Sequence, residues 1–385
     1  MIYNFDELPD RKSSESVKWH YYDEDVLPMW VADMDFQSPE PIVRALRERA
    51  EHGVFGYPQA PTGLNQAVID WLDQHYGWQV TVDDLIYVSG VVTGVNLAGN
   101  AFTGPGTGVM IQTPVYMPFL GLAHNAGAER QSMELSYHPE TGYSIDWDLF
   151  EHTITEQTRM FVLCNPHNPI GRVFSRHELE RMAEICLRRN VLICSDEIHG
   201  DLVFSGQRHI PIASLDAEVA RRTITLMAPS KTFNIAGLAC SVAIIQDSEL
   251  RRQFRAAGRG LTHGVNLFGL VSARAAYSEG QEWLDQLLPY LQANRDWLYD
   301  FVKNELPGVR MFRTEGTYLA WLDCRQADTA GLPPGQFFLE KARVALIDGS
   351  AFGAGGDGFV RLNFGCPRSM LQEALCRMRS ALAPG

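Results

Sequence analysis

The sequence has no long apolar segment, no closely spaced cysteine pair and no excess of basic residues. No stretch approaches the ~18 consecutive apolar residues that a membrane-spanning helix needs, so we expect no membrane protein. The opening segment MIYNFDELPDRK contains no apolar signal sequence. The formal net charge of −13 gives an acidic surface, which repels nucleic-acid phosphates and anionic lipids. We therefore expect no nucleic-acid partner and no membrane partner.

The seven cysteines are odd in number and scattered, and no pair has CxxC spacing. This pattern argues against a disulfide framework and against a structural zinc site. Several lie in apolar runs such as VLICSDE, where a free cysteine behaves as a small core residue. Free thiols are typical of a reducing compartment, so we expect a cytoplasmic protein.

The chain of 385 residues is long enough for about two domains. Its first forty residues are irregular, and PMWVADMDF reads as an extended arm. A helical pattern then begins in SPEPIVRALRERAEHG, where we expect Ser38 to cap the helix and Gly53 to end it. NQAVIDWLDQHYG and SRHELERMAEICLRRN predict further helices.

From about residue 85 the chain carries short apolar, β-branched runs with helical stretches between many of them, namely LIYVSG, GVMIQTP, RMFVLCNP, VLICSDEI, TITLMAPS and CSVAIIQ. This alternation predicts a mainly parallel sheet covered on both faces. Long amphipathic helices follow, and then the strand-like runs TYLAWLDCR, VALIDG and FVRLNFG. We therefore predict an arm (1–40) that joins a small α+β domain (276–385), and a large domain (41–275) between them.

Polar clusters stand at the ends of three predicted strands: Asn165–Asn168, Asp196–His199 and Ser230–Lys231. Ligands of open α/β sheets bind beyond the strand ends. The three clusters therefore predict one shared site.

Lys231, in LMAPSKTFNIAG, is either a lysine that reaches solvent or a partly desolvated nucleophile of the Schiff-base kind. Asp196, in ICSDEIHGD, could keep a pyridine nitrogen protonated, although a helix cap or an ion pair would also explain it. Strand alternation would also place Glu197, His199 and Asp201 on one face, but no other feature supports a metal site, and we predict none.

Asn168, in CNPHNPIGRV, lies in a loop stiffened by two Asn-Pro pairs, where an amide serves either as a cofactor donor or as a turn residue. Arg361 lies in the apolar strand FVRLNFG, where an unpaired charge is costly. Its guanidinium fork suits a substrate carboxylate, and a structural ion pair is the alternative.

The segments NPHNPIG, SDEIHGDL and SKTFNIAGL, in this order, resemble the fold-type I enzymes of the aspartate-aminotransferase superfamily, which use pyridoxal 5'-phosphate (PLP). The segments SVKWH, LPMWVADMDF, FGYP, TPVYMPF, EGTYLAWLDCR and FVRLNFGCPRS resemble one branch, the MalY/PatB-type cystathionine β-lyases, or carbon–sulfur β-lyases. The resemblance covers nearly the whole chain. It implies the α/β fold of fold-type I PLP enzymes, with a seven-stranded, mainly parallel sheet and a smaller α+β domain.

The resemblance assigns cofactor contacts to four side chains. Lys231 is similar to the lysine that holds PLP as a Schiff base and removes the Cα proton. Asp196 is similar to the partner of the pyridine nitrogen, and Asn168 to the partner of the cofactor's O3' that also contacts substrate. Tyr116, in TPVYMPF, resembles the ring that stacks on the pyridine and could protonate a leaving group, although an ordinary core aromatic would fit the residue alone.

The remaining assignments concern phosphate, substrate and a second subunit. Val91 and Val92 open a predicted helix whose amides suit the phosphate, and Ser230 adds a hydroxyl. Arg361 resembles the arginine that binds the substrate α-carboxylate. Tyr57, in FGYP, resembles a tyrosine that reaches the cofactor and substrate of the neighbouring subunit, which implies a homodimer, whereas a packed loop aromatic is the plain alternative.

Three positions depart from the aminotransferase pattern. Ala228 and Ala239 stand where many aminotransferases carry a phosphate-binding serine and arginine, and His199 stands where they carry tyrosine. We count His199 among the cofactor-binding residues. These departures fit the lyase branch better than the transaminases.

The resemblance implies β-elimination of L-cystathionine or related cysteine S-conjugates to a thiol, pyruvate and ammonia, a reaction of sulfur amino-acid metabolism and methionine biosynthesis. The alternatives are a class I/II aminotransferase, a non-catalytic regulator with a PLP-enzyme fold, and a biosynthetic lyase for a specialised C–S bond. The leaving group is set by loops that the sequence alone does not place.

Overall fold

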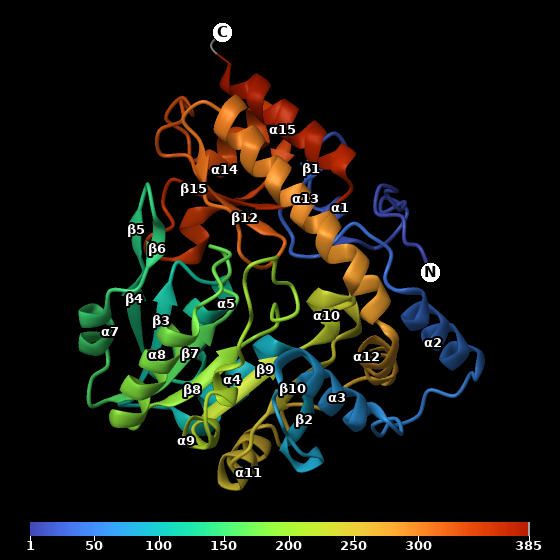
Figure 1. Cartoon of the computed structure of the whole chain (residues 1–385), viewed down its shortest axis with the longest axis vertical. Coiled ribbons are helices and arrows are strands. Elements are labelled where there is room, and N and C mark those ends of the chain that lie inside the picture. Colours follow the sequence, from blue (N-terminus) through green and yellow to red (C-terminus); the bar gives the residue numbers. More distant parts are fainter. Residues whose placement is uncertain (384–385) are drawn as a thin grey trace.

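The computed structural model describes residues 1–383, and two sheets dominate it (Figure 1). The longer helices are α2 (Glu40–Glu51), α3 (Leu64–Tyr76), α4 (Val91–Phe102), α7 (Trp147–Thr153), α8 (Arg176–Arg188), α11 (Ser248–Ala257), α12 (Leu267–Glu279), α13 (Gln281–Glu305) and α15 (Arg368–Leu382). The shorter ones are α1 (Val17–His20), α5 (Met117–Leu120), α6 (Leu122–Asn125), α9 (Ala217–Arg221), α10 (Pro229–Thr232) and α14 (Pro334–Phe337). Single turns are η1 (Val82–Asp84), η2 (Ile212–Ser214), η3 (Ala236–Leu238), η4 (Phe338–Ala342) and η5 (Gly349–Phe352).

Within residues 1–383 the large sheet has seven strands, in the order β2 (Leu85–Val88), β10 (Ser241–Ile244), β9 (Thr223–Met227), β8 (Leu192–Asp196), β7 (Thr158–Cys164), β3 (Gly108–Thr113) and β4 (Glu129–Glu134). Only β10 runs antiparallel to its neighbours in this sheet. The predicted seven-stranded, mainly parallel sheet is therefore confirmed. Strand β4 was not predicted, because its sequence ERQSME is largely exposed and carries no apolar run.

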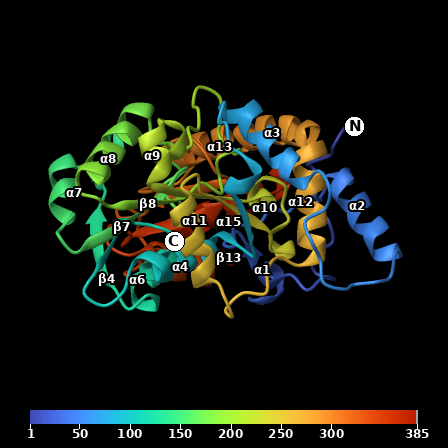
Figure 2. The same ribbon diagram turned by 90° about the horizontal axis from the view of Figure 1, so that it is seen from below.

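Alternate side chains of each central strand enter different cores. On β7, Val162 and Cys164 pack with the core beneath α4, whereas Phe161 and Leu163 pack with the core beneath α8. Figure 2 shows α4 and α6 on one side of the large sheet and α8 and α9 on the other. Both faces are covered, which explains why these strands read as continuous apolar runs.

The small sheet lies above the large sheet in the view of Figure 1. It has the order β11 (Arg310–Met311), β12 (Leu319–Asp323), β15 (Phe359–Asn363) and β14 (Ile347–Asp348), and its neighbouring strands are antiparallel. Helices α13 and α15 contribute apolar side chains to the same core as its strands. A separate hairpin, β5 (Ser136–His138) and β6 (Gly142–Ser144), extends from the large sheet toward the small one.

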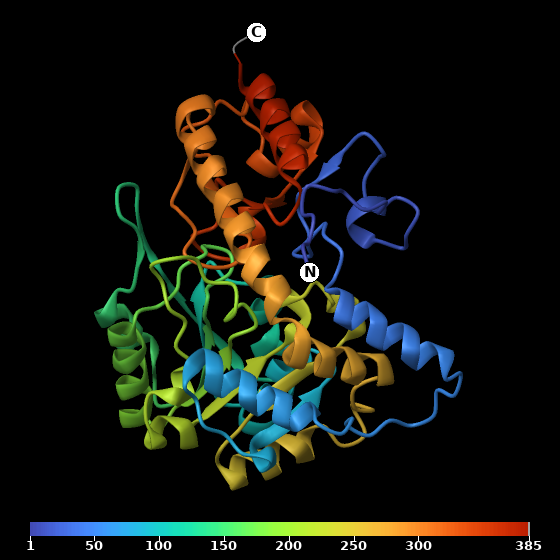
Figure 3. The same ribbon diagram turned by 45° about the vertical axis from the view of Figure 1, so that its right-hand side comes forward.

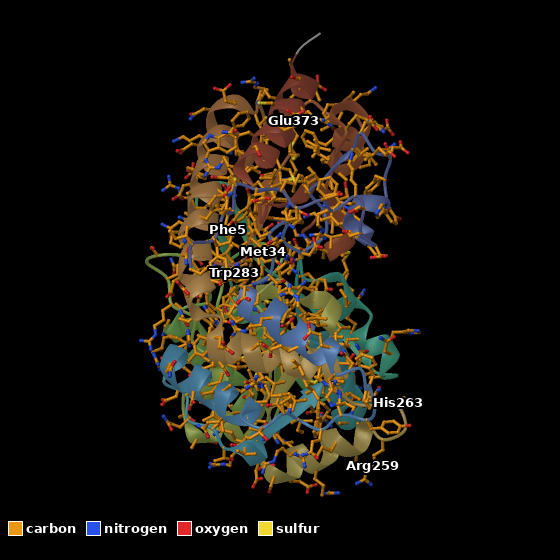
Figure 4. All side chains as sticks on the ribbon, turned by 90° about the vertical axis from the view of Figure 1, so that its right-hand side faces the viewer. Phe5, Met34, Arg259, His263, Trp283 and Glu373 are labelled. Atoms are coloured by element: carbon orange, nitrogen blue, oxygen red, sulfur yellow. The ribbon has the colours of Figure 1, made fainter. Side chains whose placement is uncertain are left out.

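The N-terminal arm is tied to the small sheet's side of the molecule (Figure 3). Strand β1 (Leu27–Pro28) pairs in parallel with β13 (Val344–Ala345). Phe5, Met34 and Trp283 meet in one core where the arm crosses α13 (Figure 4). The predicted boundary at residue 275 lies inside α12, and the division into three parts stays a prediction.

The predicted cap of α2 is wrong. Pro39 occupies the position before the helix, and the hydroxyl of Ser38 donates to the carbonyl of Asn234 instead. Gly53 does follow the helix with a left-handed φ of 73°, as expected of a residue that ends a helix. The sequence misleads at Ser38 because a cap and an arm contact have the same signature.

A buried ion pair holds two segments of the arm together. Lys18 donates to Asp35 across 2.6 Å, and both side chains are almost fully buried. Asp33 and Arg11 extend the network. The Asp33 carboxylate lies 3.4 Å from Lys18 Nζ and 2.8 Å from Arg11 Nη2. Burial lowers the pKa of Lys18, but the carboxylates of Asp35 and Asp33 together outweigh it and leave the pKa raised.

Within residues 1–383, no helix has both the length and the apolar composition needed to cross a membrane.

We expect Lys18→Met to lower the free energy of unfolding by about 3–5 kcal/mol, because it leaves the Asp35 carboxylate buried without its cation. The measurement is the shift of the urea midpoint. Arg252→Gln, which removes an exposed pair with Glu249, is the matched control and should leave the midpoint unchanged. Equal effects of the two substitutions would contradict a stabilising role for the buried pair.

Candidate active site

A cavity of about 260 Å³ opens at the ends of β7, β8 and β9. Eight of the ten predicted site residues line it, namely Val91, Val92, Tyr116, Asn168, Asp196, His199, Ser230 and Lys231. Parallel strands place their carboxyl ends at one edge, which is why segments far apart in sequence meet here.

Lys231 lies on α10, directly after β9. Its Nζ is 2.7 Å from the carbonyl of Ala32, to which it donates a hydrogen bond. Burial and the nearby Arg361 lower the pKa of the Lys231 amine to about 8. Ala32 belongs to the arm, so the arm forms one wall of the cavity. A lysine with a lowered pKa has an unprotonated fraction near neutral pH, which nucleophilic chemistry requires.

Asp196 ends β8 and is 4% exposed. Its Oδ1 accepts a hydrogen bond from the backbone N–H of Ile198 at 3.0 Å. Among residues 1–383 it has no ion-pair partner within 4 Å, and burial raises its carboxyl pKa to about 7. The side chain therefore favours a cationic partner inside the cavity.

Arg361 and Asn168 join the small sheet to the large one. Arg361 Nη1 donates to Asn168 Oδ1, and its Nη2 donates to the Trp30 carbonyl of the arm, each at 3.0 Å. Arg361 is 2% exposed, and burial lowers its pKa to about 10. It has no carboxylate partner within the described chain, and its Nε has no hydrogen-bond partner there. The structural ion pair considered from the sequence is thus absent from this part.

The N-terminus of α4 faces the cavity with Val91, Val92 and Thr93. The first amides of a helix have no acceptor within the helix, so these groups are suited to an anion. Gly94 lets the helix approach β9, because a Cβ there would lie 2.5 Å from a Leu226 methyl carbon. Ser230 lines the cavity as well.

Two rings border the cavity. Tyr116 precedes α5 and is partly buried, and burial raises its pKa. His199 is 3% exposed, and burial lowers its pKa to about 3, so the ring is neutral at pH 7. Its Nδ1 has no hydrogen-bond partner in residues 1–383. An unpaired buried nitrogen beside a cavity is suited to a ligand that supplies a partner.

Tyr57 does not reach the cavity of its own chain. It lies between α2 and α3 and is fully exposed. Its predicted contact with a neighbouring subunit stays a prediction.

Sequence reasoning missed the backbone contacts of the arm. The carbonyls of Trp30 and Ala32 bind Arg361 and Lys231, and Tyr318 also donates to Ala32 at 2.8 Å. Main-chain acceptors carry no side-chain signature. The only available signal was the position of WVADMDF, an apolar and acidic run without helical period.

Two of the three residues considered for a metal have other partners. Glu197 accepts from Ser195 and contacts His209, each at 2.8 Å, while Asp201 accepts from Thr232 at 2.7 Å. No group of side chains with metal-ligand character occurs within residues 1–383.

A model of the family described as aminotransferase class I and II matches residues 24–378. The chain belongs to this family. It is 41% identical over 391 residues to cystathionine beta-lyase PatB of Bacillus subtilis, covering 99% of this chain and 100% of the relative. The resemblance drawn from the motifs is therefore confirmed.

Solved structures agree with this membership. The PLP-bound C-S lyase of Staphylococcus hominis superposes with a TM-score of 0.93 at 32% identity, covering 100% of this chain and 99% of that one. OvoB superposes with a TM-score of 0.94 at 42% identity, covering the whole of both chains. The fold-type I architecture is thus shared with an enzyme whose structure contains PLP.

Asp196 gives the protein without cofactor a specific pH dependence. The folded pKa of Asp196, about 7, lies above the ordinary value of 3.8, so the folded protein holds this proton more tightly than the unfolded chain does. The resulting stability is fully present below pH 4 and is lost as the pH rises through 7. We expect Asp196→Asn to raise the thermal midpoint of the cofactor-free protein at about pH 8, with the gain vanishing near pH 4. Asp300→Asn, at an exposed carboxylate, is the control. A gain that is the same at both pH values would rule out this origin.

Proposed function

We propose that this protein is a PLP-dependent carbon–sulfur β-lyase that splits L-cystathionine or a related cysteine S-conjugate, with uptake of one water molecule, into a thiol, pyruvate and ammonia. One observation carries the proposal: a partly desolvated amine, an unpaired buried carboxylate and a free helix N-terminus surround one cavity. The names of the relatives, cystathionine beta-lyase and C-S lyase, support the choice of reaction.

The residues fit PLP group by group. Lys231 would hold its aldehyde carbon, Asp196 its pyridine nitrogen, and the amides of Val91 and Val92 its phosphate. The unpaired carboxylate of Asp196 is the strongest support for a bound PLP, because a buried acid without a cation is otherwise unfavourable. Asn168 and Ser230 would add hydrogen bonds, Tyr116 a stacking ring, and His199 a further contact. When bound, PLP draws electrons from the Cα of an attached amino acid.

Arg361 would orient the substrate. Its guanidinium has one unpaired nitrogen and lies beside Asn168, which lines the cavity. A carboxylate held by a guanidinium fork has both position and direction fixed. Arg361 would thus fix the α-carboxylate and leave the Cα–H bond facing Lys231.

Lys231 would move the proton of the substrate Cα. Its Nζ, with a pKa of about 8, takes the proton from Cα, and the thiolate then leaves from Cβ. The leaving sulfur receives a proton from Lys231 or from the hydroxyl of Tyr116. Transamination would use the same groups but would return the proton to the cofactor. The cavity residue Ala239 stands where many transaminases carry arginine, which favours elimination.

The proposed working form is a cytoplasmic homodimer in which Tyr57 completes the partner's site. Val54, Phe55 and Tyr57 are exposed together on the loop between α2 and α3, and exposed apolar side chains of this kind mark interfaces. A reducing compartment is supported by the seven free cysteines.

The deciding measurement adds L-cystathionine to the purified protein with PLP and follows absorbance, pyruvate and ammonia together. We expect a visible cofactor band that changes on addition, with pyruvate and ammonia released in equal amounts without a keto acid. A strict requirement for a keto acid, without net ammonia, would establish an aminotransferase instead. A band without products from this or other thioethers would contradict the lyase.

Subunit mixing tests Tyr57. We expect Lys231→Ala and Tyr57→Ala homodimers each to be inactive or nearly so. Co-expressed with different tags and purified as the heterodimer, they should regain about half of the wild-type activity, because one of the two sites then has both residues. A heterodimer as inactive as its parents would show that Tyr57 does not act across subunits. The control pairs Lys231→Ala with the wild type and should also reach about half.

A further inference from the structure

A second cavity, of about 260 Å³, lies outside the proposed active site. It forms where the β5–β6 hairpin and the loop after Asn168 meet the small sheet (Figure 1). Tyr143, Phe312, Trp321 and Phe359 give it an aromatic wall. Nothing in the proposed reaction uses this space.

Not every charged side chain around this second cavity has an ion-pair partner. Arg172 is bonded to Glu178, and the carboxylate of Asp323 is bonded to Arg325. Arg310, on β11, lines the cavity and has neither a hydrogen-bond nor an ion-pair partner for its side chain among residues 1–383. Arg310 is exposed, so its guanidinium is available to an anionic ligand that enters the cavity.

Shape and charge together define the ligand. Ligand pockets for drug-sized molecules span roughly 300–1,000 Å³, so this smaller cavity suits a molecule with one ring. Aromatic walls favour a ring, and the fork of Arg310 favours a carboxylate. We propose that the second cavity binds a single-ring aromatic carboxylate, with its acid group on Arg310. The ligand would be an aryl acid or an aromatic α-amino acid, and the Glu315 carboxylate, which also lines the cavity, would suit the ammonium of the latter.

Two routes connect this second cavity with the first. Through the small sheet, Trp321 is the cross-strand partner of Arg361, and the ring of Phe352 contacts both, with centroid distances of 5.2 Å to Trp321 and 5.1 Å to the Arg361 guanidinium. A ligand against Trp321 would therefore restrain the side chain that orients substrate.

The second route is the loop that follows Asn168. The carbonyl of Gly171 accepts from the N–H groups of Glu315 and Gly316, at 2.9 and 3.0 Å, and Glu315 accepts from the N–H of Val173 at 2.8 Å. Both the loop and Glu315 line the second cavity. Occupation there would bias the position of Asn168, and by linkage a substrate in the first cavity would change affinity for the second ligand.

The test is calorimetric titration of the holoenzyme with phenylacetate and, separately, with L-phenylalanine. Cofactor absorbance, recorded in parallel, reports any probe that enters the first cavity. We expect binding heat, a dissociation constant at least tenfold weaker in Arg310→Gln, and an intermediate value in Arg310→Lys, which keeps the charge but loses the fork. Arg379→Gln, on α15 and outside both cavities, is the matched control and should bind as the wild type does.

Tighter binding of L-phenylalanine would assign the site to an amino acid, and tighter binding of phenylacetate to an aryl acid. No heat from either probe, or the same heat in Arg310→Gln as in the wild type, would overturn the proposal. The measurement needs no turnover, so its outcome is independent of whether the lyase reaction is correctly assigned.

Discussion

The molecule depends on keeping three charged groups away from water around one cavity. The amine of Lys231, the carboxyl of Asp196 and the guanidinium of Arg361 all have pKa values shifted by burial toward the neutral form. Such desolvation is unfavourable in an empty protein and favourable once ligands of matching charge fill it. The rest of the fold supplies the apolar cover that makes this desolvation possible.

The cover comes from three separate parts of the chain. Strand ends of the large sheet provide Asp196 and Lys231, the small sheet provides Arg361, and the arm provides the carbonyls of Trp30 and Ala32. The buried pair of Lys18 and Asp35 holds the arm in its own fold without touching the cavity, while Asn234 and Asn363 bind carbonyls of the arm from outside it. A defect in the arm would thus disturb the reaction by changing the positions of Lys231 and Arg361.

Much of this could be predicted from the sequence, and the limits are physical. Strands β7, β8 and β9 have continuous apolar runs, so the residue pattern alone places Asp196 and Lys231 at strand ends. Exposed β4 has no such run, and Ser38 has a cap signature that the arm uses differently. Contacts made by main-chain carbonyls, and the second cavity around Arg310, arise only from tertiary packing.

The pairing of β1 with β13 also has a consequence for biosynthesis. It joins Leu27, made among the first residues on the ribosome, to Val344, made among the last. The large sheet can form while the chain is still being translated, since all its strands precede residue 245. The pairing of β1 must wait for nearly the whole chain, and so must Met34, which packs beside Gly365 and remains without this partner until synthesis is almost complete.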